Sequence, residues 1–130
     1  MHAKLDLIGI VVEDMARSLA FYRHLGLDVP PEADEQPHVE MALPGGLRLA
    51  WDTEETIRSF DPDRQPASGG SRMALAFRFD RPAEVDAAYH ELTSLGYHGH
   101  QAPWDAVWGQ RYAIVVDPDG NEIDLFSPTS

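Results

Sequence analysis

The same order of predicted elements occurs twice along this chain, and that repetition limits the folds it can adopt. In each half an apolar strand leads into a helix, and a Leu-Gly pair follows the helix, at Leu25-Gly26 and at Leu95-Gly96. A short candidate strand follows each glycine, so each half is predicted as β-α-β-β-β over about 60 residues. Two such modules bury their apolar faces together and leave a shared groove, which predicts an α+β fold of paired modules.

Local signals predict where both helices begin and end. Asp14 is a favourable N-cap, and apolar side chains then recur at i, i+4 and i+7, which predicts a helix over about 15–25. In the second half Pro82 lies in the first turn of a helix that Gly96 ends. The remaining strands are predicted at 4–12, 38–43, 47–52 and 73–79.

The segment 53–71 is rich in Pro, Gly and charged residues and is interpreted as a linker, with one helical turn at 54–59. We therefore expect a single domain over residues 1–130, with a first βαβββ module at 1–60 and a second at 72–130.

The most informative segment is the last hairpin. Strands are predicted over Gln110–Val116 and Asn121–Phe126, joined by the turn Asp117-Pro118-Asp119-Gly120. The second strand carries a carboxylate, Asp124, where an apolar side chain is expected for simple packing. Asp124 is therefore a candidate functional residue.

Composition excludes several classes of function. The chain has no cysteine, so it has no disulfide, no thiolate nucleophile and no Cys-ligated metal site. It carries 10 Lys plus Arg against 22 Asp plus Glu, and the net charge of -12 disfavours nucleic acid and anionic lipid. No segment reaches the length of a membrane span, and no basic leader precedes a long apolar run. We expect a cytoplasmic protein without nucleic-acid or membrane partners.

Two segments resemble the vicinal oxygen chelate superfamily, which includes glyoxalase I, extradiol dioxygenases and bleomycin-resistance proteins. Residues 10–22, IVVEDMARSLAFY, are similar to the first strand and helix of the family, and residues 116–125, VDPDGNEIDL, are similar to its closing hairpin. The resemblance covers essentially the whole chain. It implies paired βαβββ modules that curve into a U-shaped cleft, and often a homodimer.

In the enzymes of that family a divalent metal lies in the cleft, held by His or Glu from four strands. The resemblance places these positions on Leu7, Arg48, Ala74 (or Met73) and Asp124. Leu and Ala do not ligate such metals, and a guanidinium repels a cation. Only Asp124 matches, whereas a catalytic metal needs about three protein ligands. We expect no metal and no cofactor.

Two hypotheses concern polar residues. Arg48 and Asp124 would meet across the cleft floor in a charge-assisted hydrogen bond that replaces the metal, or both would point to solvent. His38, His98 and His100 offer an alternative set of metal ligands, although ordinary roles on strands or loops are favoured for them.

Tryptophans near a groove can stack on planar or cationic ligands. Trp104 and Trp108 lie in a loop before the closing hairpin, and this segment resembles one that borders the drug cleft in the bleomycin-resistance branch. Packing of the hairpin or of a subunit interface is the alternative role for both. The expected ligand contacts are Leu7, Arg48, Trp51, Trp104, Asp105, Trp108, Tyr112, Asp124 and Phe126.

The sequence thus predicts a protein that binds a small, planar or cationic, antibiotic-like organic molecule in a metal-free cleft and sequesters it. No catalytic residue is required, and no Gly-x-Ser-x-Gly elbow is present. The alternatives are a metal-dependent glyoxalase-type lyase or dioxygenase, an isomerase with Asp124 as base and Arg48 as electrophile, and a regulatory module that binds a metabolite.

Overall fold

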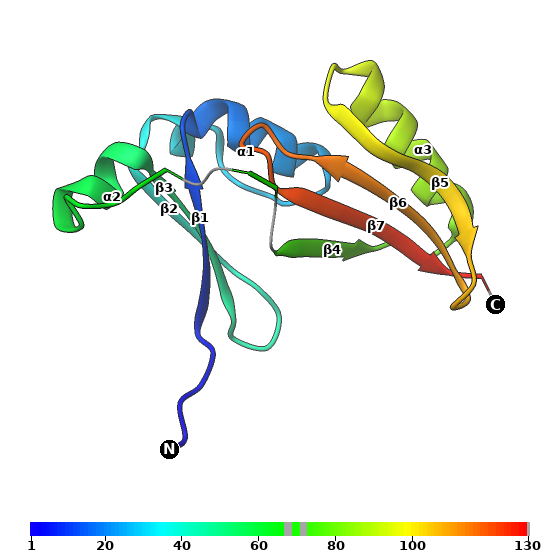
Figure 1. Cartoon of the computed structure of the whole chain (residues 1–130), viewed down its shortest axis with the longest axis horizontal. Coiled ribbons are helices and arrows are strands. Elements are labelled where there is room, and N and C mark those ends of the chain that lie inside the picture. The colour runs from blue at the N-terminus through cyan, green and yellow to red at the C-terminus, as the bar shows by residue number, and fades with distance from the viewer. Residues whose placement is uncertain (67–68, 71–72, 130) are drawn as a thin grey trace. The chain divides into compact units, whose positions relative to one another are not determined.

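The computed structural model describes residues 1–66, 69–70 and 73–129 (Figure 1). The chain divides into two compact units, Met1–Ala67 and Ser68–Ser130, and the division lies inside the segment interpreted as a linker. Each unit contains a small mixed sheet with helices, so the predicted α+β class is confirmed. The grouping of both modules into one domain stays a prediction.

Unit 1 contains a three-stranded sheet in the order β1-β3-β2. Its elements are β1 (Leu7–Val12), α1 (Met15–His24), the 3₁₀ helix η1 (Pro31–Glu35), β2 (His38–Ala42), β3 (Arg48–Thr53) and α2 (Glu54–Phe60). β1 runs parallel to β3, and β2 runs antiparallel to it, as a hairpin strand should. The apolar side chains of the sheet alternate toward a core that also holds Leu19, Phe21 and Tyr22 of α1.

Unit 2 contains a four-stranded sheet in the order β4-β7-β6-β5. Its elements are β4 (Ala74–Arg78), α3 (Pro82–Ser94), β5 (His98–Ala106), β6 (Gln110–Val116) and β7 (Glu122–Pro128). This is the complete β-α-β-β-β order that the sequence predicts. Helix α3 contacts β5, β6 and β7 and covers one face of the sheet (Figure 1). Its buried Val85 and Leu92 pack toward that face, where Ala113, Val115 and Ile123 are also fully buried.

Both helices end in the same way, as the repeated Leu-Gly pair predicts. After α1 the backbone N–H of Gly26 donates to the Arg23 carbonyl at 3.0 Å, and the N–H of Leu27 donates to Tyr22. After α3 the N–H of Gly96 donates to Thr93 and that of Tyr97 to Leu92. These paired bonds form the Schellman motif, whose left-handed residue is glycine with φ of 102° and 96°. The structure confirms both ends within one residue.

Two expectations about elements are wrong. No strand follows Gly26; residues Leu27–Val29 turn back on the helix and lead into η1, because Pro30 and Pro31 lack the N–H groups that a strand pairs. The described part of unit 1 therefore has three strands. Trp104 and Asp105, expected in a loop, lie inside β5, because this strand continues past irregularities between Gly99 and Trp104.

The helical turn that the sequence places in the linker is present as α2. The Thr53 hydroxyl accepts a hydrogen bond from the backbone N–H of Thr56 at 3.1 Å, which caps the helix. Two acidic residues in its first turn favour the same end through the helix dipole. Among the described residues, no helix combines the length and the apolar character that crossing a membrane requires.

Candidate functional site

One face of the sheet in unit 2 gathers most of the residues that the sequence singles out. Strand alternation directs Ile123 and Leu125 of β7 toward α3 and Asp124 and Phe126 to the opposite face. Register then places Tyr112 of β6 directly across from Phe126. Trp104 of β5 lies across from Tyr112 on its other side. We call the set Trp104, Trp108, Tyr112, Asp124 and Phe126 the aromatic face.

The rings of the aromatic face contact one another. Tyr112 lies at the centre, with ring centroids 5.5 Å from Trp104 and 5.4 Å from Trp108, both edge to face. Phe126 stacks on Tyr112 at 6.3 Å with an interplanar angle of 27°. The Trp108 side chain, in the turn between β5 and β6, is 58% exposed and donates from Nε1 to Gln110 at 2.8 Å. Such ring geometry is favourable and leaves aromatic surface at the solvent.

Asp124 is the polar centre of this face. Its Oδ2 accepts a hydrogen bond from the Tyr112 hydroxyl at 2.5 Å. Burial, and then this hydrogen bond, raises the pKa of Tyr112 to about 12, so the hydroxyl stays a donor at physiological pH. The other oxygen, Oδ1, is buried and has no hydrogen-bond partner among the described residues. Most buried polar atoms are paired, so this atom needs an explanation.

Asp105 lies on the other face of the sheet, away from the aromatic face. Strand alternation places it across from Arg111, and its carboxylate lies 3.3 Å from the guanidinium of that residue. Arg111 also pairs in bidentate fashion with Asp86 of α3, at 2.9 and 3.0 Å. Asp105 thus takes part in an ion-pair group between the sheet and α3. The sequence predicts it as a ligand contact beside the aromatic residues, but it lies on the opposite face of the sheet from them.

Trp51, another expected ligand contact, is fully buried in the core of unit 1. It lies on the core side of β3, and its ring contacts Tyr22 of α1 edge to face at 5.5 Å. The alternation of β3 decides this outcome, because Leu49 and Trp51 share one side of the strand and Arg48 and Asp52 the other. In the described structure Trp51 is a packing residue.

Arg48 has partners inside unit 1. Its guanidinium donates to Glu40 at 2.6 Å and to Asp6 at 2.5 Å, next to Leu7, which pairs with Arg48 in register. The hydrogen bonds that Arg48 donates to Asp6 and then to Glu40 raise its pKa further, so it stays cationic. Arg48 lies in unit 1 and Asp124 in unit 2, and their pairing across the cleft stays a prediction.

His38 extends the same charged group. Its Nε2 lies 2.7 Å from Glu40 and its Nδ1 lies 2.5 Å from Asp52, so both ring nitrogens have partners. The hydrogen bonds to Glu40 and then to Asp52 raise the pKa of His38 above 6.5. Of the other two histidines, His100 lies 3.9 Å from a carboxylate oxygen of Glu122.

The residues at the four family positions do not fit a divalent metal. Leu7 and Ala74 have no donor atom, Arg48 is a cation held by two carboxylates, and Asp124 alone supplies oxygen. Within residues 1–66, 69–70 and 73–129, no group of three or more His, Cys, Asp or Glu side chains could hold a metal ion. His38 lies in unit 1 and His98 and His100 lie in unit 2, so the alternative ligand set of these three histidines stays a prediction.

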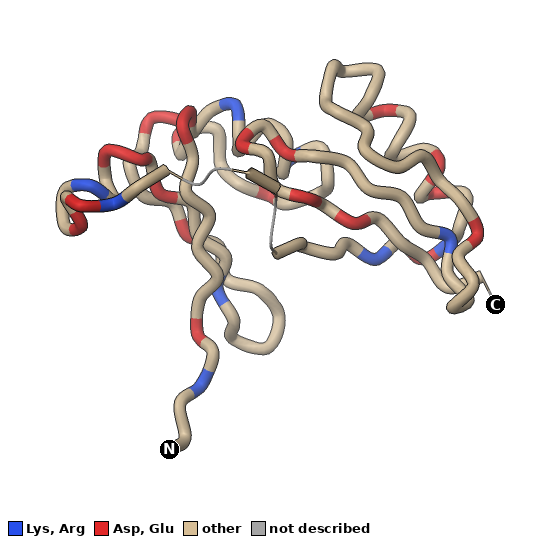
Figure 2. Tube along the Cα trace, in the orientation of Figure 1, with Lys and Arg blue, Asp and Glu red and all other residues tan. Residues whose placement is uncertain are grey.

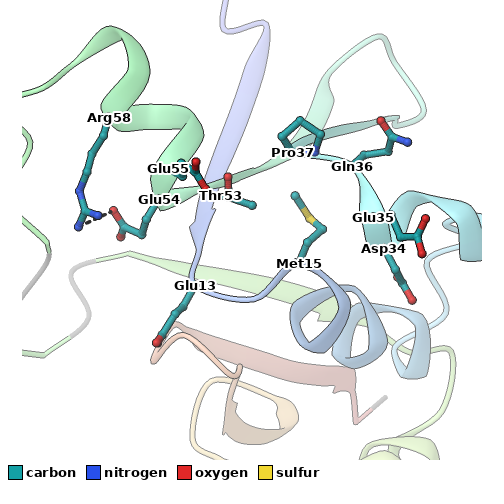
Figure 3. Close-up of a pocket in the computed structure, with 10 residues that line it drawn as sticks. All are labelled: Glu13, Met15, Asp34, Glu35, Gln36, Pro37, Thr53, Glu54, Glu55 and Arg58. Carbon is teal, nitrogen blue, oxygen red and sulfur yellow. Dashed lines mark ion pairs between the residues drawn. The ribbon is translucent and has the colours of Figure 1, made fainter.

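A cavity of about 490 Å³ lies in unit 1 and is rich in carboxylates (Figure 3). It is lined by Glu13, Met15, Asp34, Glu35, Gln36, Pro37, Thr53, Glu54, Glu55 and Arg58. Acidic residues gather on η1 and α2 (Figure 2). Asp34 accepts from Arg23 at 2.8 Å, and Glu54 pairs with Arg64 at 3.0 Å. The sequence did not predict this cavity, although residues 30–37 and the start of α2 are rich in acidic side chains.

Comparison with solved structures shows the same fold at low identity. A glyoxalase/bleomycin resistance protein/dioxygenase family enzyme from Burkholderia phytofirmans has a TM-score of 0.81 and 18% identity, covering 97% of this chain and 99% of that one. A hypothetical protein from S. aureus has a TM-score of 0.78 and 17% identity, covering 98% and 94%. A glyoxalase-related enzyme from Fulvimarina pelagi has a TM-score of 0.75 and 20% identity, covering 95% and 87%.

A comparison with curated proteins found no match. A family model, by contrast, matches residues 4–125, which is nearly the whole chain and includes both segments that carry the resemblance. This chain belongs to the Glyoxalase/Bleomycin resistance protein/Dioxygenase superfamily.

Proposed function

We propose that this protein binds a small, planar organic molecule on its aromatic face and sequesters it without transforming it. The observation that supports this most strongly is the cluster of four rings beside the carboxylate of Asp124, in which Tyr112 contacts the other three. An antibiotic-like compound with a fused aromatic system is the ligand class that such a surface suits. We further propose that the protein acts as a homodimer, as the family resemblance implies.

The rings offer enough surface for useful affinity. Each stacked or edge-on aromatic contact contributes about 0.5 to 1.5 kcal/mol beyond simple burial, and a cation over a ring contributes a similar amount. Trp108 is 58% exposed, so a ligand can cover aromatic surface that is wet in the free protein. Three or four such contacts add up to about 1.5 to 6 kcal/mol, and burial of the apolar surface of the ligand adds to this sum. Micromolar affinity corresponds to about -8 kcal/mol.

Sequestration requires only binding and a sufficient concentration of protein. A stoichiometric protein lowers the free concentration of a compound once the protein concentration exceeds the dissociation constant. The residues at the family metal positions do not fit a divalent metal, and sequestration requires no metal. The acidic net charge of -12 favours cationic over anionic members of the ligand class.

Calorimetric titration with proflavine, a planar cationic dye, tests the proposal. We expect binding by the wild-type protein, and at least a threefold loss of affinity in Trp108→Ala, because that side chain is exposed and contacts two other rings. Phe60→Ala is the matched control, since Phe60 is also an exposed aromatic residue, 70% accessible, but ends α2 in unit 1.

Absence of proflavine binding, or equal losses in Trp108→Ala and Phe60→Ala, would contradict the proposal. The enzyme alternative is tested in parallel by measuring bound Fe, Mn, Ni and Zn after incubation and desalting, followed by glyoxalase and dioxygenase assays. Turnover together with a near-stoichiometric bound metal would support the enzyme alternative and contradict sequestration. The molar mass from light scattering tests the proposed homodimer.

A further inference from the structure

The unpaired oxygen of Asp124 restricts the ligand more narrowly than the rings do. Oδ2 is already used by the Tyr112 hydroxyl, and that hydroxyl has a single hydrogen to donate. Oδ1 is buried and has no hydrogen-bond partner in the described part of the chain. A carboxylate oxygen only accepts hydrogen bonds, so the group that pairs with Oδ1 must be a hydrogen-bond donor.

The side chains next to Asp124 in register offer no donor. Ala76 of β4 lies beside it on one side and Ile114 of β6 on the other, and neither side chain has a polar atom. On the same face, the side chains diagonal to Asp124 include Tyr112, whose hydroxyl binds Oδ2, and Arg78 of β4, which makes no hydrogen bond to Oδ1. A buried unpaired acceptor is costly, and a charge-assisted hydrogen bond is stronger than a neutral one.

We propose that Asp124 is the specificity-determining residue of the aromatic face, and that it selects planar ligands that present an N–H donor from a cationic ring or from an amine attached to it. This inference rests on the proposed function and names the ligand class of the same site. The ligand ring covers Tyr112 and Phe126 while its N–H group donates to Oδ1. The same carboxylate rejects anionic ligands by charge repulsion.

Access to Oδ1 does not require a change in the fold. Asp124 as a residue is only partly buried, and the terminal torsion of an Asp side chain is broad and roughly two-fold. Ala76, its neighbour on β4, is exposed and small. A modest rotation of the carboxylate can therefore bring Oδ1 to an entering donor.

A matched pair of dyes separates hydrogen bonding from stacking and charge. Proflavine and N-methylacridinium are both planar tricyclic cations, but N-methylacridinium has no N–H group. We expect wild-type protein to bind proflavine at least tenfold more tightly, as one charge-assisted hydrogen bond predicts. In Asp124→Asn we expect that preference to fall below threefold. Glu91→Gln, which removes an exposed carboxylate on α3, should keep the full preference.

A labelled carboxyl carbon gives a second readout that does not depend on any variant. In wild-type protein with ¹³C-labelled aspartate, proflavine should shift the Asp124 resonance, whereas N-methylacridinium should not. Equal affinities for both dyes, or an unchanged preference in Asp124→Asn, would overturn this inference and leave the proposed function intact. If neither dye bound, both would be overturned.

Discussion

The replacement of Gly99 by alanine tests how closely α3 packs on β5. A Cβ atom on Gly99 would lie 2.7 Å from Cζ of Tyr89, closer still to its hydroxyl oxygen, and 2.9 Å from Cγ2 of Thr93. Real Cβ atoms essentially never come within 3.0 Å of another heavy atom. The backbone of Gly99 does not have a positive φ, so the restriction comes from space alone. Gly99→Ala must therefore displace the helix or the tyrosine.

The expected cost follows from two opposing effects. Overpacking a filled site costs about 1 to 3 kcal/mol. Alanine in place of glycine in a strand recovers roughly 0.5 to 1 kcal/mol through the unfolded state. Taking the middle of each range, we expect a net loss of about 1 kcal/mol in the free energy of unfolding, which lowers Tm by roughly 4 °C in a protein of this size.

Thermal and urea unfolding followed by circular dichroism measure this effect. Gly9→Ala is the matched control, because Gly9 also lies in a strand, and a Cβ there would meet only Cδ2 of Leu7 at an ordinary 3.6 Å. The double variant with Tyr89→Leu should recover part of the loss, since it removes the hydroxyl and Cζ. If Gly99→Ala melted with the wild type, or if Tyr89→Leu added its own loss in full, the packing argument would be wrong.

Two further predictions concern ionisation. The carboxylates of Glu40 and Asp52 raise the pKa of His38, so its stabilising contribution is complete below about pH 6.5 and is lost as pH rises through the folded-state pKa. The fall in Tm between about pH 6 and pH 9 should be larger for the wild type than for His38→Gln, and equal falls would refute this. For Tyr112 we expect a pKa of about 12, measured by NMR titration of the ring carbons. In Asp124→Asn we expect a lower pKa, because the carboxylate that disfavours the phenolate is gone. An unchanged pKa in the variant would contradict that cause.

Much of the local structure could be predicted because its signals lie within a few residues of one another. The N-cap at Asp14 and the glycine ends of both helices depend on side chains and backbone groups three to five positions apart. The closing hairpin follows from the Asp-Pro-Asp-Gly turn, where the Asp117 side chain also accepts from the backbone N–H of Asn121 at 2.8 Å. The candidate strand after Gly26 failed because a strand requires a partner, and short apolar runs do not reveal one.

Only some of the candidate site residues could be predicted from the sequence. The sequence identified Trp104, Trp108, Tyr112 and Phe126 as a possible ligand surface, and the structure brings their rings together. The sequence alone could not show that Trp51 is a core residue and not a ligand contact, because a tryptophan near a turn has the same local sequence pattern whether it faces a core or solvent.

By itself, the sequence determined the order of the elements, the ends of the helices, the closing turn and the resemblance to the superfamily, because these depend on local patterns. The tertiary structure decided the partners of the polar side chains. Arg48 lies beside Asp6 because β1 and β3 pair in parallel across 41 positions. Asp124 has one unpaired oxygen, and its in-register neighbours on both sides, Ala76 and Ile114, have no polar atom in their side chains. Such contacts depend on register between distant segments, and a shift of one residue would turn every side chain to the other face.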